Sequence, residues 1–579
     1  MKQPLELVFL WHMHQPDYRD HRDGEFALPW VYLHALKDYT DMAAHLERHP
    51  RVHGVVNFVP VLLEQIEDYV AQFESGKFRD PLLRLLAAPE EPASLSVADR
   101  EFLLQTCFRS NHTTMLAPFP RYQRLLDLYR NLTHEGETAL AYLSDTYFTD
   151  LVTWYHLVWT GESARRRLPL LAELMSKGEA YTYTDRQALL TLIGEELREI
   201  IPRYQALAKS GQIEISSTPQ THPLAPLLLD FKVARETQPD APLPFAPAYP
   251  GGRSRVAAQI EAARASHASR FGEPPVGMWP AEGAISTAFV KQLAEQGCRW
   301  IASGEGVLRA SLDHGSTAAA ADSRAAYRPW RLESAPGLTL FFRDERLSDL
   351  IGFEYAKWHG QDAASHFVAE LAAIHAATPA GERAVVSVIM DGENAWEHYP
   401  YNGHYFFEDL YTQLEAQADI RTTTFASLLD AEDAPQPTVL PGLTAGSWVY
   451  GTLSTWIGDP DKNHAWDLLC SAKQSYDQVM AGQRLTEAER TAASAQLAIC
   501  ESSDWFWWFG DYNPATAVAS FDRLYRRNLV NLYQLLRLPP PAQLEIPISG
   551  AEPGTHSTDG HATRSTEDKG GGVMRRAKE

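Results

Sequence analysis

The chain carries the stretch Val-Val-Ser-Val-Ile-Met-Asp-Gly-Glu-Asn at residues 385–394, an apolar run that stops abruptly at Asp391. A second stretch, Val-Gly-Met-Trp-Pro-Ala-Glu-Gly at residues 276–283, stops in the same way at Glu282. Short apolar runs are typical of parallel strands covered by helices. In such folds, active sites lie at the carboxyl ends of the strands. The two stretches therefore predict paired carboxylates at one edge of a parallel sheet.

Eight apolar runs of this kind alternate with amphipathic segments along the chain. We predict strands at 5–11, 52–58, 213–216, 276–279, 300–302, 338–342, 385–390 and 421–424. Helical patterns occur at 33–46, 255–270, 285–296 and 363–376. The alternation predicts an α/β fold, either a β/α barrel or a doubly wound sheet.

Two helix-rich regions interrupt this alternation. The region from about residue 90 to 200 is predicted to be a helical insertion in a catalytic domain that spans 1–435. Helical patterns at 465–480, 487–500 and 516–538 predict a C-terminal helical domain over 436–540 that contributes to the cleft. Residues 550–579 are almost free of apolar side chains, and we expect this tail to be disordered.

The composition restricts the classes of partner. The formal net charge of −22 would repel phosphate backbones and anionic lipids, which argues against nucleic-acid and membrane-surface partners and favours a neutral substrate. The four cysteines form no Cys-x-x-Cys pair, so we expect free thiols in a reducing compartment. Because the chain shows neither a secretory signal nor a membrane-spanning apolar run, we expect a cytoplasmic protein.

The paired acids Glu282 and Asp391 indicate glycosidase chemistry. Hydrolysis of a glycosidic bond requires one carboxylate to act at the anomeric carbon and a second to protonate the departing oxygen. In retaining enzymes the two groups lie about 5 Å apart, a separation that opposed strand ends around a barrel can provide. Each acid also has a structural interpretation. Glu282 fits the first turn of a helix, and Asp391 fits a turn before Gly392.

Histidines follow two of the predicted strands. His12 and His14 are two residues apart in Trp-His-Met-His-Gln-Pro, so on a strand they point to the same side. Two imidazoles on one face either donate hydrogen bonds to sugar hydroxyls or hold a metal. The segment 214–226 predicts a strand followed by a proline-pinned loop that holds His222 in place.

The segment 501–510 places five aromatic residues beside Asp504 in the C-terminal helical region. An isolated exposed helix with this composition would be unusual, so the segment is predicted to pack against the barrel with Asp504 and one tryptophan at the rim.

These motifs, in order, resemble the five sequence regions of glycoside hydrolase family 57. They are His14-Gln15-Pro16, the 214–226 loop, Trp279-Pro280-Ala281-Glu282, Met390-Asp391-Gly392-Glu393 and Ser503-Asp504-Trp505. The resemblance implies an incomplete (β/α)7 barrel with a helical C-terminal bundle. It also implies retaining action on α-glucans without a cofactor or metal. The last two motifs most resemble the amylopullulanase and α-amylase branch of the family.

The resemblance also implies roles for individual residues. Glu282 matches the nucleophile and Asp391 the acid/base, whereas His14, His222, Trp279 and Asp504 match substrate-binding positions. We add His12 to these, and Trp396 and Trp505 as candidate stacking platforms for sugar rings. The eight predicted strands exceed the seven that the family barrel implies.

Several alternatives stay open at this point. The same site would perform transglycosylation if a sugar hydroxyl replaced water as acceptor, as in a 4-α-glucanotransferase or a branching enzyme. Glu393, Glu397 and Glu305 are rival acids. A metal-dependent hydrolase or deacetylase would use His12, His14, His222 and Asp391 as ligands. A glucan-binding protein without catalysis is the third class. Linkage preference, chain-length preference and oligomeric state are left open by the sequence.

Overall fold

The computed structural model describes residues 2–549 except 90–94, 135–136, 315–321 and 511, so the predicted tail at 550–579 lies outside the described residues. Seven parallel strands follow one another around a barrel in the order β1-β2-β3-β4-β5-β7-β8, and β8 pairs with β1. Between β7 and β8 only Arg343 and Ser387 are in register, so the barrel closes weakly there. The predicted (β/α)7 barrel is confirmed. The strands are β1 (Leu5–Met13), β2 (Gly54–Phe58), β3 (Ile213–Ser217), β4 (Gly277–Met278), β5 (Trp300–Gly304), β7 (Ala335–Arg343) and β8 (Val385–Asp391).

The additional predicted strand is β9 (Ile420–Thr422), whereas the 338–342 run is part of β7 inside the barrel. One edge of β1 is taken by β8, which pairs along Glu6–His12. On the other edge, β2 pairs with Leu10–Met13 and β9 with Leu5–Leu7. Because β1 is nine residues long, it accommodates both short strands end to end. The two remaining strands, β6 (Trp330–Leu332) and β10 (Thr438–Leu440), extend the sheet beyond β7.

The barrel interior is filled by side chains that alternate along the strands. A buried cluster includes Val8 and Leu10 of β1, Val55 of β2 and Ile389 of β8. Side chains at positions i and i+2 of a strand share a face. The interior positions above this apolar layer are therefore those of His12, Asn57 and Asp391. The helix α18 (Phe425–Asp430) closes the opposite end with Phe425 and Leu428.

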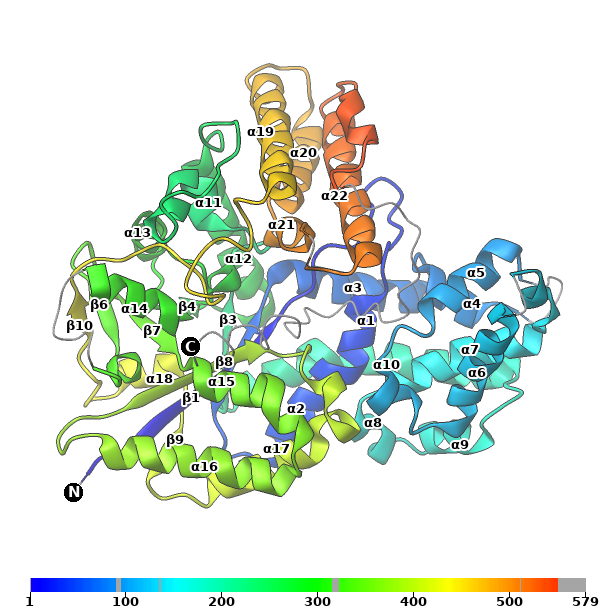
Figure 1. Ribbon diagram of the computed structural model, residues 1–579, viewed down its shortest axis with the longest axis horizontal. Coiled ribbons are helices and arrows are strands. Elements are labelled where there is room, and N and C mark those ends of the chain that lie inside the picture. Colours follow the sequence, from blue (N-terminus) through cyan, green and yellow to red (C-terminus); the bar gives the residue numbers. More distant parts are fainter. Residues whose placement is uncertain (1, 90–94, 135–136, 315–321, 511, 550–579) are drawn as a thin grey trace.

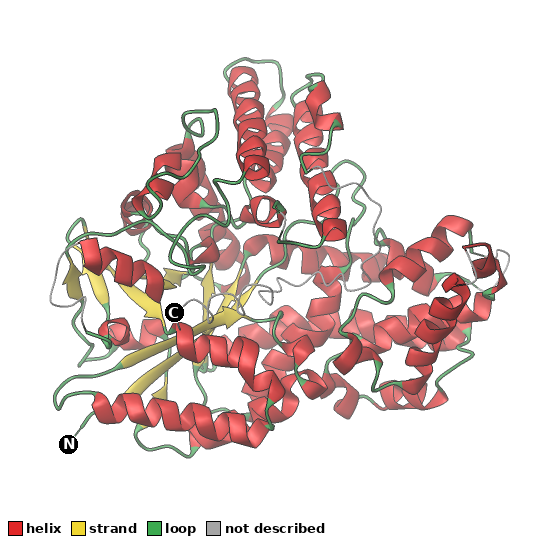
Figure 2. Ribbon diagram, in the orientation of Figure 1, coloured by secondary structure: helices red, strands yellow, loops and turns green. Residues whose placement is uncertain are grey.

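Helices surround the sheet, and a run of helices lies between β2 and β3 along the chain (Figures 1 and 2). Figure 1 shows α4 to α9 gathered to one side of the strands. This run comprises α3 (Pro60–Ser75), α4 (Pro81–Ala87), α5 (Val97–Thr106), α6 (Pro120–His134), α7 (Asp145–Val158), α8 (Glu162–Arg167), α9 (Pro169–Lys177) and α10 (Tyr183–Lys209). The region from about residue 90 to 200, predicted to be a helical insertion, corresponds to α5 through most of α10. Other helices are α1 (Trp30–His34), α2 (Thr40–Arg48), α11 (Ala225–Leu229), α12 (Gly252–Phe271), α13 (Thr287–Glu295), α14 (Glu305–His314), α15 (Glu345–Asp349), α16 (Gly360–Ala377) and α17 (His404–Glu415).

The C-terminal helices are α19 (Pro460–Met480), α20 (Glu487–Cys500), α21 (Ser503–Trp508) and α22 (Ala515–Leu535). Figure 1 shows α19, α20 and α22 standing beside one another, with α21 at their lower ends. Backbone contacts dock this region on the loop after β3: the Ser503 amide donates to the His222 carbonyl at 2.8 Å, and Ser502 forms a bridge with Pro223. The C-terminal helices therefore deliver side chains directly to the end of the barrel.

The four cysteines are buried and unpaired, as the sequence predicted. None of the helices in the described ranges combines the length and apolar character that a membrane crossing requires.

Candidate active site

Three neighbouring strands place polar side chains at one level of the barrel interior. In the register of the sheet, His12 of β1 lies between Asn57 of β2 and Asp391 of β8. Gly392 then lets β8 approach β1 closely, because a Cβ at this position would lie 2.1 Å from the Met13 sulfur. The carboxyl ends of these strands thus form the floor of the site.

Glu282 lies just after β4 in a strained backbone conformation. Its φ of 59° is in the left-handed region, which is rare for residues other than glycine and is concentrated at functional sites. The side chain is buried, with 1% of the residue exposed. Its Oε1 accepts from the Ser503 hydroxyl at 3.0 Å, and its Oε2 accepts from the Trp448 indole N–H at 3.3 Å. Because each oxygen receives a donor, the carboxylate is fixed in orientation.

His222 joins Glu282 to the barrel interior. Its backbone is also left-handed, with φ 61°. Its Nδ1 lies 2.8 Å from the Ser503 hydroxyl, and its Nε2 lies 3.1 Å from Nε2 of His12. Nδ1 of His12 in turn lies 2.7 Å from Oδ1 of the Asn57 side-chain amide. A continuous series of polar contacts therefore runs from Asn57 to Glu282.

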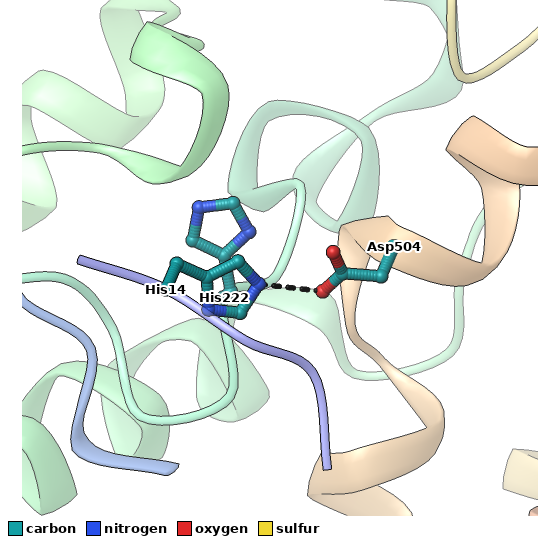
Figure 3. Close-up of side chains that lie close together, drawn as sticks. All are labelled: His14, His222 and Asp504. Atoms are coloured by element: carbon teal, nitrogen blue, oxygen red, sulfur yellow. Dashed lines mark hydrogen bonds and ion pairs between the residues drawn. The ribbon is translucent and has the colours of Figure 1, made fainter. Parts of the chain in front are cut away.

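His14 and Asp504 form a second polar pair beside this series (Figure 3). Nε2 of His14 lies 2.7 Å from Oδ2 of Asp504, which also accepts from the Ser502 hydroxyl at 2.7 Å. The His14 ring stacks on the His222 ring with centroids 3.9 Å apart and planes inclined by 20°. Nδ1 of His14 is buried and has no hydrogen-bond partner among the described residues.

His14, His222 and Asp504 are close enough to be considered as metal ligands, since one donor atom from each lies within 4.8 Å of the others. Imidazole binds a metal at about 2.1 Å along a lone pair in the plane of the ring. Two stacked rings direct their lone pairs into separate parallel planes, so they do not converge on one ion. Both nitrogens of His222 are already in hydrogen-bond contact with other groups. The observed geometry therefore fits a hydrogen-bonded cluster better than a metal centre.

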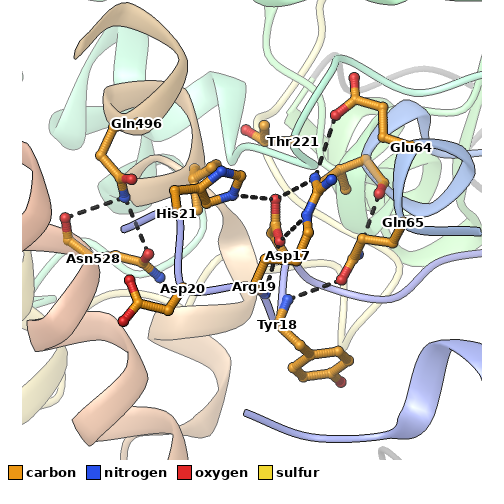
Figure 4. A network of polar contacts seen from close by, with 12 residues as sticks. Asp17, Tyr18, Arg19, Asp20, His21, Glu64, Gln65, Thr221, Gln496 and Asn528 are labelled. Carbon is orange, nitrogen blue, oxygen red and sulfur yellow. Dashed lines mark hydrogen bonds and ion pairs between the residues drawn. The ribbon is translucent and has the colours of Figure 1, made fainter. Parts of the chain in front are cut away.

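The loop that carries His14 is fixed by a buried polar network (Figure 4). Arg19 and His21 pair with the buried Asp17 carboxylate at 2.7 and 2.9 Å. Burial alone would raise the pKa of Asp17, but the charges and hydrogen bonds of Arg19 and His21 hold it well below its usual value. Asp20 accepts from the Asn531 amide of α22 at 2.8 Å. The loop after β1 is thus tied to the C-terminal helices.

Asp391 lies at the wall of a small hollow and is more accessible than Glu282. Its Oδ2 accepts from the Asn394 amide at 2.8 Å. The hollow is lined by His14, Gln15, Pro16, Tyr18, Asp391, Glu393, Asn394, Asp504, Trp508 and Phe521. The two candidate catalytic acids therefore border the same histidine cluster: Asp391 shares the hollow with His14, and Glu282 lies 3.8 Å from His222.

The rival acids have other surroundings. Glu393 accepts from the His14 backbone N–H and the Gln15 amide, both at 3.3 Å, so it anchors the loop after β1. Glu397 is buried, and its Oε1 lies 3.8 Å from Nε2 of His398. Glu305 pairs with Arg309 on the surface of α14 at 2.7 Å.

The tryptophans chosen from the sequence are buried. Trp279 packs edge-to-face on Trp448 with centroids 5.2 Å apart, and its indole N–H has no partner in the described part of the chain. Trp396 is 1% exposed within an aromatic cluster and donates to the Gly392 carbonyl at 2.8 Å. Trp505 is fully buried and donates to the Ile499 carbonyl at 2.7 Å. Trp508, from the same segment as Trp505, is the tryptophan that lines the hollow.

Three residues of the site were not selected from the sequence. Ser503 adjoins Asp504 in the segment that the sequence analysis did single out. Asn57 ends a predicted strand at the level of His12. Trp448 lies in a loop before α19 without regular structure, and nothing in the sequence marks it as a neighbour of Glu282.

The sequence profile described as Glycosyl hydrolase family 57 matches residues 8–440, a region that contains both candidate acids and all three histidines. The chain belongs to glycosyl hydrolase family 57. As a family 57 member it is an enzyme of the glycosidase type. No curated protein matches the chain.

Three solved structures have a similar fold, and two of them are described as family 57 branching enzymes. A branching enzyme from Thermococcus kodakaraensis is 17% identical with a TM-score of 0.58, covering 92% of this chain and 90% of that one. A branching enzyme from Pyrococcus horikoshii is 16% identical with a TM-score of 0.55, and the match covers 96% of this chain and 98% of that one. The α-amylase AmyC from Thermotoga maritima is 13% identical with a TM-score of 0.52, and the match covers 92% of this chain and 96% of that one. At these identities the likeness establishes the fold, and the predicted amylopullulanase branch stays a prediction.

Proposed function

We propose that this family 57 member acts on α-glucans with retention of configuration, using Glu282 as nucleophile and Asp391 as acid/base. The observation that carries the proposal is the contrast between the two carboxylates. Glu282 is buried and receives a donor on each oxygen. Asp391 borders the hollow with an amide donor on Oδ2. Different surroundings of two acids assign them different roles.

The proposed reaction has two steps. A carboxylate oxygen of Glu282 forms a bond to the anomeric carbon while the bond to the leaving oxygen breaks, and that oxygen takes the proton of Asp391. Asp391, now a carboxylate, takes a proton from the acceptor. The acceptor oxygen then bonds to the anomeric carbon and the ester to Glu282 breaks. Two inversions give retention.

Other residues around the two acids are proposed to position the sugar. Since Nε2 of His14 contacts Asp504, its buried Nδ1 is left to accept from a sugar hydroxyl. Whereas His14 offers an acceptor, the buried indole N–H of Trp279 offers a hydrogen-bond donor to the sugar. Trp508 offers an aromatic wall. We propose that Trp396 supports the Asp391 loop and that Trp505 supports α21, because each bonds a backbone carbonyl of its neighbourhood.

Azide rescue tests the two roles separately. In Glu282→Ala, azide would attack an activated α-glucosyl substrate directly and give the β-glycosyl azide. In Asp391→Ala, azide would attack the glycosyl-enzyme and give the α-glycosyl azide. We expect each variant to lose at least about a thousandfold in kcat without azide. Proton NMR identifies the anomer. The opposite pairing of variants and anomers would show that the roles are exchanged.

Two of the rival acids, Glu305 and Glu393, provide controls for the azide experiment. Glu305→Gln removes a surface carboxylate and should retain activity within about twofold. Glu393→Gln alters the anchor of the His14 loop and should change KM without creating any azide product. A glycosyl azide formed by the Glu393 variant would transfer a catalytic role to that residue.

Transglycosylation is the second candidate, favoured by the burial of Glu282 and by the aromatic wall of Trp508 and Phe521, which restrict water at the ester. Two of the structurally similar proteins are described as branching enzymes. Incubation with amylose, amylopectin and pullulan distinguishes the outcomes. Net release of reducing ends identifies a hydrolase, whereas altered linkages or lengths with constant reducing ends identify a transferase.

The metal-dependent alternative has its own test. The stacked rings of His14 and His222 lead us to expect activity on glucan to survive dialysis against a chelator, with metal content checked by elemental analysis. Loss of activity on metal removal and recovery on its return would favour the metal-dependent alternative.

A further inference from the structure

Four hydrogen-bond contacts connect Asn57 to Glu282 without a break. They join Asn57 to His12 (2.7 Å), His12 to His222 (3.1 Å), His222 to Ser503 (2.8 Å) and Ser503 to Glu282 (3.0 Å). Each contact needs one hydrogen between its two heavy atoms. Two neutral imidazoles and one hydroxyl supply three hydrogens, and an ionised carboxylate supplies none. The fourth hydrogen must come from the Asn57 amide or from an added proton.

The neighbours of Asn57 decide where that hydrogen originates. The hydroxyl of Thr218 lies 2.8 Å from the Trp279 carbonyl, which can only accept, so its single hydrogen goes there. The same hydroxyl oxygen lies 3.0 Å from Oδ1 of Asn57, which also only accepts, so this contact has a hydrogen only if the amide is turned to place its nitrogen there. The Ser216 hydroxyl oxygen lies 2.9 Å from Nδ2 of Asn57, and this hydroxyl can donate its hydrogen when the amide oxygen takes that place.

The structure places Oδ1 of Asn57 toward Thr218 and His12 and Nδ2 toward Ser216. All of these contacts are satisfied in the opposite orientation, with the amide NH2 facing Thr218 and His12 and the amide oxygen facing Ser216. Rotation of the amide by half a turn exchanges its nitrogen and oxygen and leaves the contact distances nearly unchanged. In that orientation Asn57 donates to Nδ1 of His12. His12 then donates from Nε2, His222 donates from Nδ1, and Ser503 donates to Glu282.

We propose that Asn57, His12, His222 and Ser503 form a one-way donor chain of neutral groups that ends on Oε1 of Glu282. This inference deepens the proposed function and rests on it for the role of Glu282 as nucleophile. The chain makes Asn57 a positioning residue, because its amide determines the tautomers of both histidines and thereby forces the Ser503 hydroxyl to donate. The nucleophile is thus oriented from inside the barrel without a buried cation.

Other charged or titratable groups face the chain from the surrounding elements. His14 stacks on His222 from the loop after β1, and Asp504 of α21 pairs with His14. Asp391 of β8 is in register with His12. The Tyr512 hydroxyl interacts electrostatically with Glu282. Arg343 of β7 lies over the ring of Trp448, which contacts Glu282. The proposed donor direction depends on the contacts within the chain, so it should persist when these neighbours titrate.

Nitrogen-15 NMR of histidine-labelled protein tests the tautomers directly. His12 and His222 are identified by the loss of their signals in His12→Gln and His222→Gln. At about pH 8 we expect both rings to be neutral, with His12 protonated at Nε2 and His222 at Nδ1. An imidazolium on either residue, or the opposite tautomers, would overturn the chain. This readout needs no substrate, so it stands even if the glycosidase proposal fails.

The variant Asn57→Asp tests the direction of the first contact with almost unchanged shape. Its carboxylate can only accept, so the ring nitrogen of His12 must become the donor and the tautomers reverse or a proton is taken up. We expect kcat to fall about 10-fold to 100-fold with KM nearly constant, provided that thermal unfolding confirms the fold. Unchanged tautomers and unchanged kcat would contradict the proposal.

Ser503 provides the matched pair at the other end. Ser503→Ala removes the last donor, and we expect a loss of kcat of similar size, whereas Ser503→Thr keeps the hydroxyl and should restore most of it. A purely structural role of Ser503 would give equal losses in both variants, and that result would count against the chain.

Discussion

At the scale of single residues, Glu282 and His222 share an uncommon feature, a left-handed backbone at a position occupied by a large side chain. Such conformations persist only where the surroundings enforce them. Here the surroundings are the hydrogen bonds of Ser503 to both side chains and of the Trp448 N–H to the Glu282 carbonyl at 3.1 Å. The strain is therefore located at the residues for which the site needs a fixed orientation.

Glu214 permits a prediction about pH. It lies inside the barrel, accepting from the Trp300 indole at 2.7 Å, and burial raises its pKa from 4.5 to about 7. A carboxyl whose pKa is higher in the folded state loses stabilisation as pH rises from about 4.5 to about 7. The stability of wild type relative to Glu214→Gln should therefore fall over this window by up to about 3 kcal/mol. Urea unfolding at several pH values measures this difference, and a pH-independent difference would contradict it.

Individual site residues differ in how far the sequence could reveal them. Glu282, Asp391 and the histidines were selected because they end strands, and strand ends converge in a barrel. Ser503 and Trp448 reach Glu282 only through tertiary packing of distant segments, which local sequence does not encode. The burial of Trp396 and Trp505 could not be predicted from the sequence either, because an aromatic residue near an acid fits both a protein core and a platform for a sugar ring.

At the scale of elements, the strand count shows what periodicity misses. The sequence predicted eight candidates, all of which exist as strands, but pattern alone could not say that β9 is outside the barrel. The reason is the length of β1, whose edge accommodates β2 and β9 in succession. The three-residue strands β6 and β10 were too short to give a periodic signal.

The packing of α20 on α12 leads to a prediction about stability. Glu501 is fully buried and accepts from Arg255 at 2.7 Å, from Tyr249 at 2.6 Å and from Gln259 at 2.8 Å. Arg255→Met would leave this carboxylate without its cation, and loss of one partner of a buried pair costs about 3–5 kcal/mol. Chemical unfolding should detect this loss. The double variant with Glu501→Gln should recover part of it, and additive losses would contradict the pairing.

At the scale of the whole molecule, the site is assembled from both ends of the chain. His14 follows the first strand, whereas Asp504 and Ser503 belong to α21, and Asn531 of α22 holds Asp20. The small hollow exists only because these segments meet above the barrel. Barrel and C-terminal helices were predictable as separate patterns. Their mutual contacts were not, since they depend on side chains several hundred residues apart.

This arrangement predicts that barrel and C-terminal helices unfold together. Buried contacts between them, such as those of Glu501 and Asp504, are lost if either part opens alone. Native-state hydrogen exchange should therefore give the same opening free energy for peptides from β1, β8, α19 and α20. In Arg255→Met, which removes one of these contacts, protection should fall by the same amount in all four elements. Fast exchange confined to α19 and α20 in the wild-type protein would show instead that the helical region is an independent unit that the site recruits.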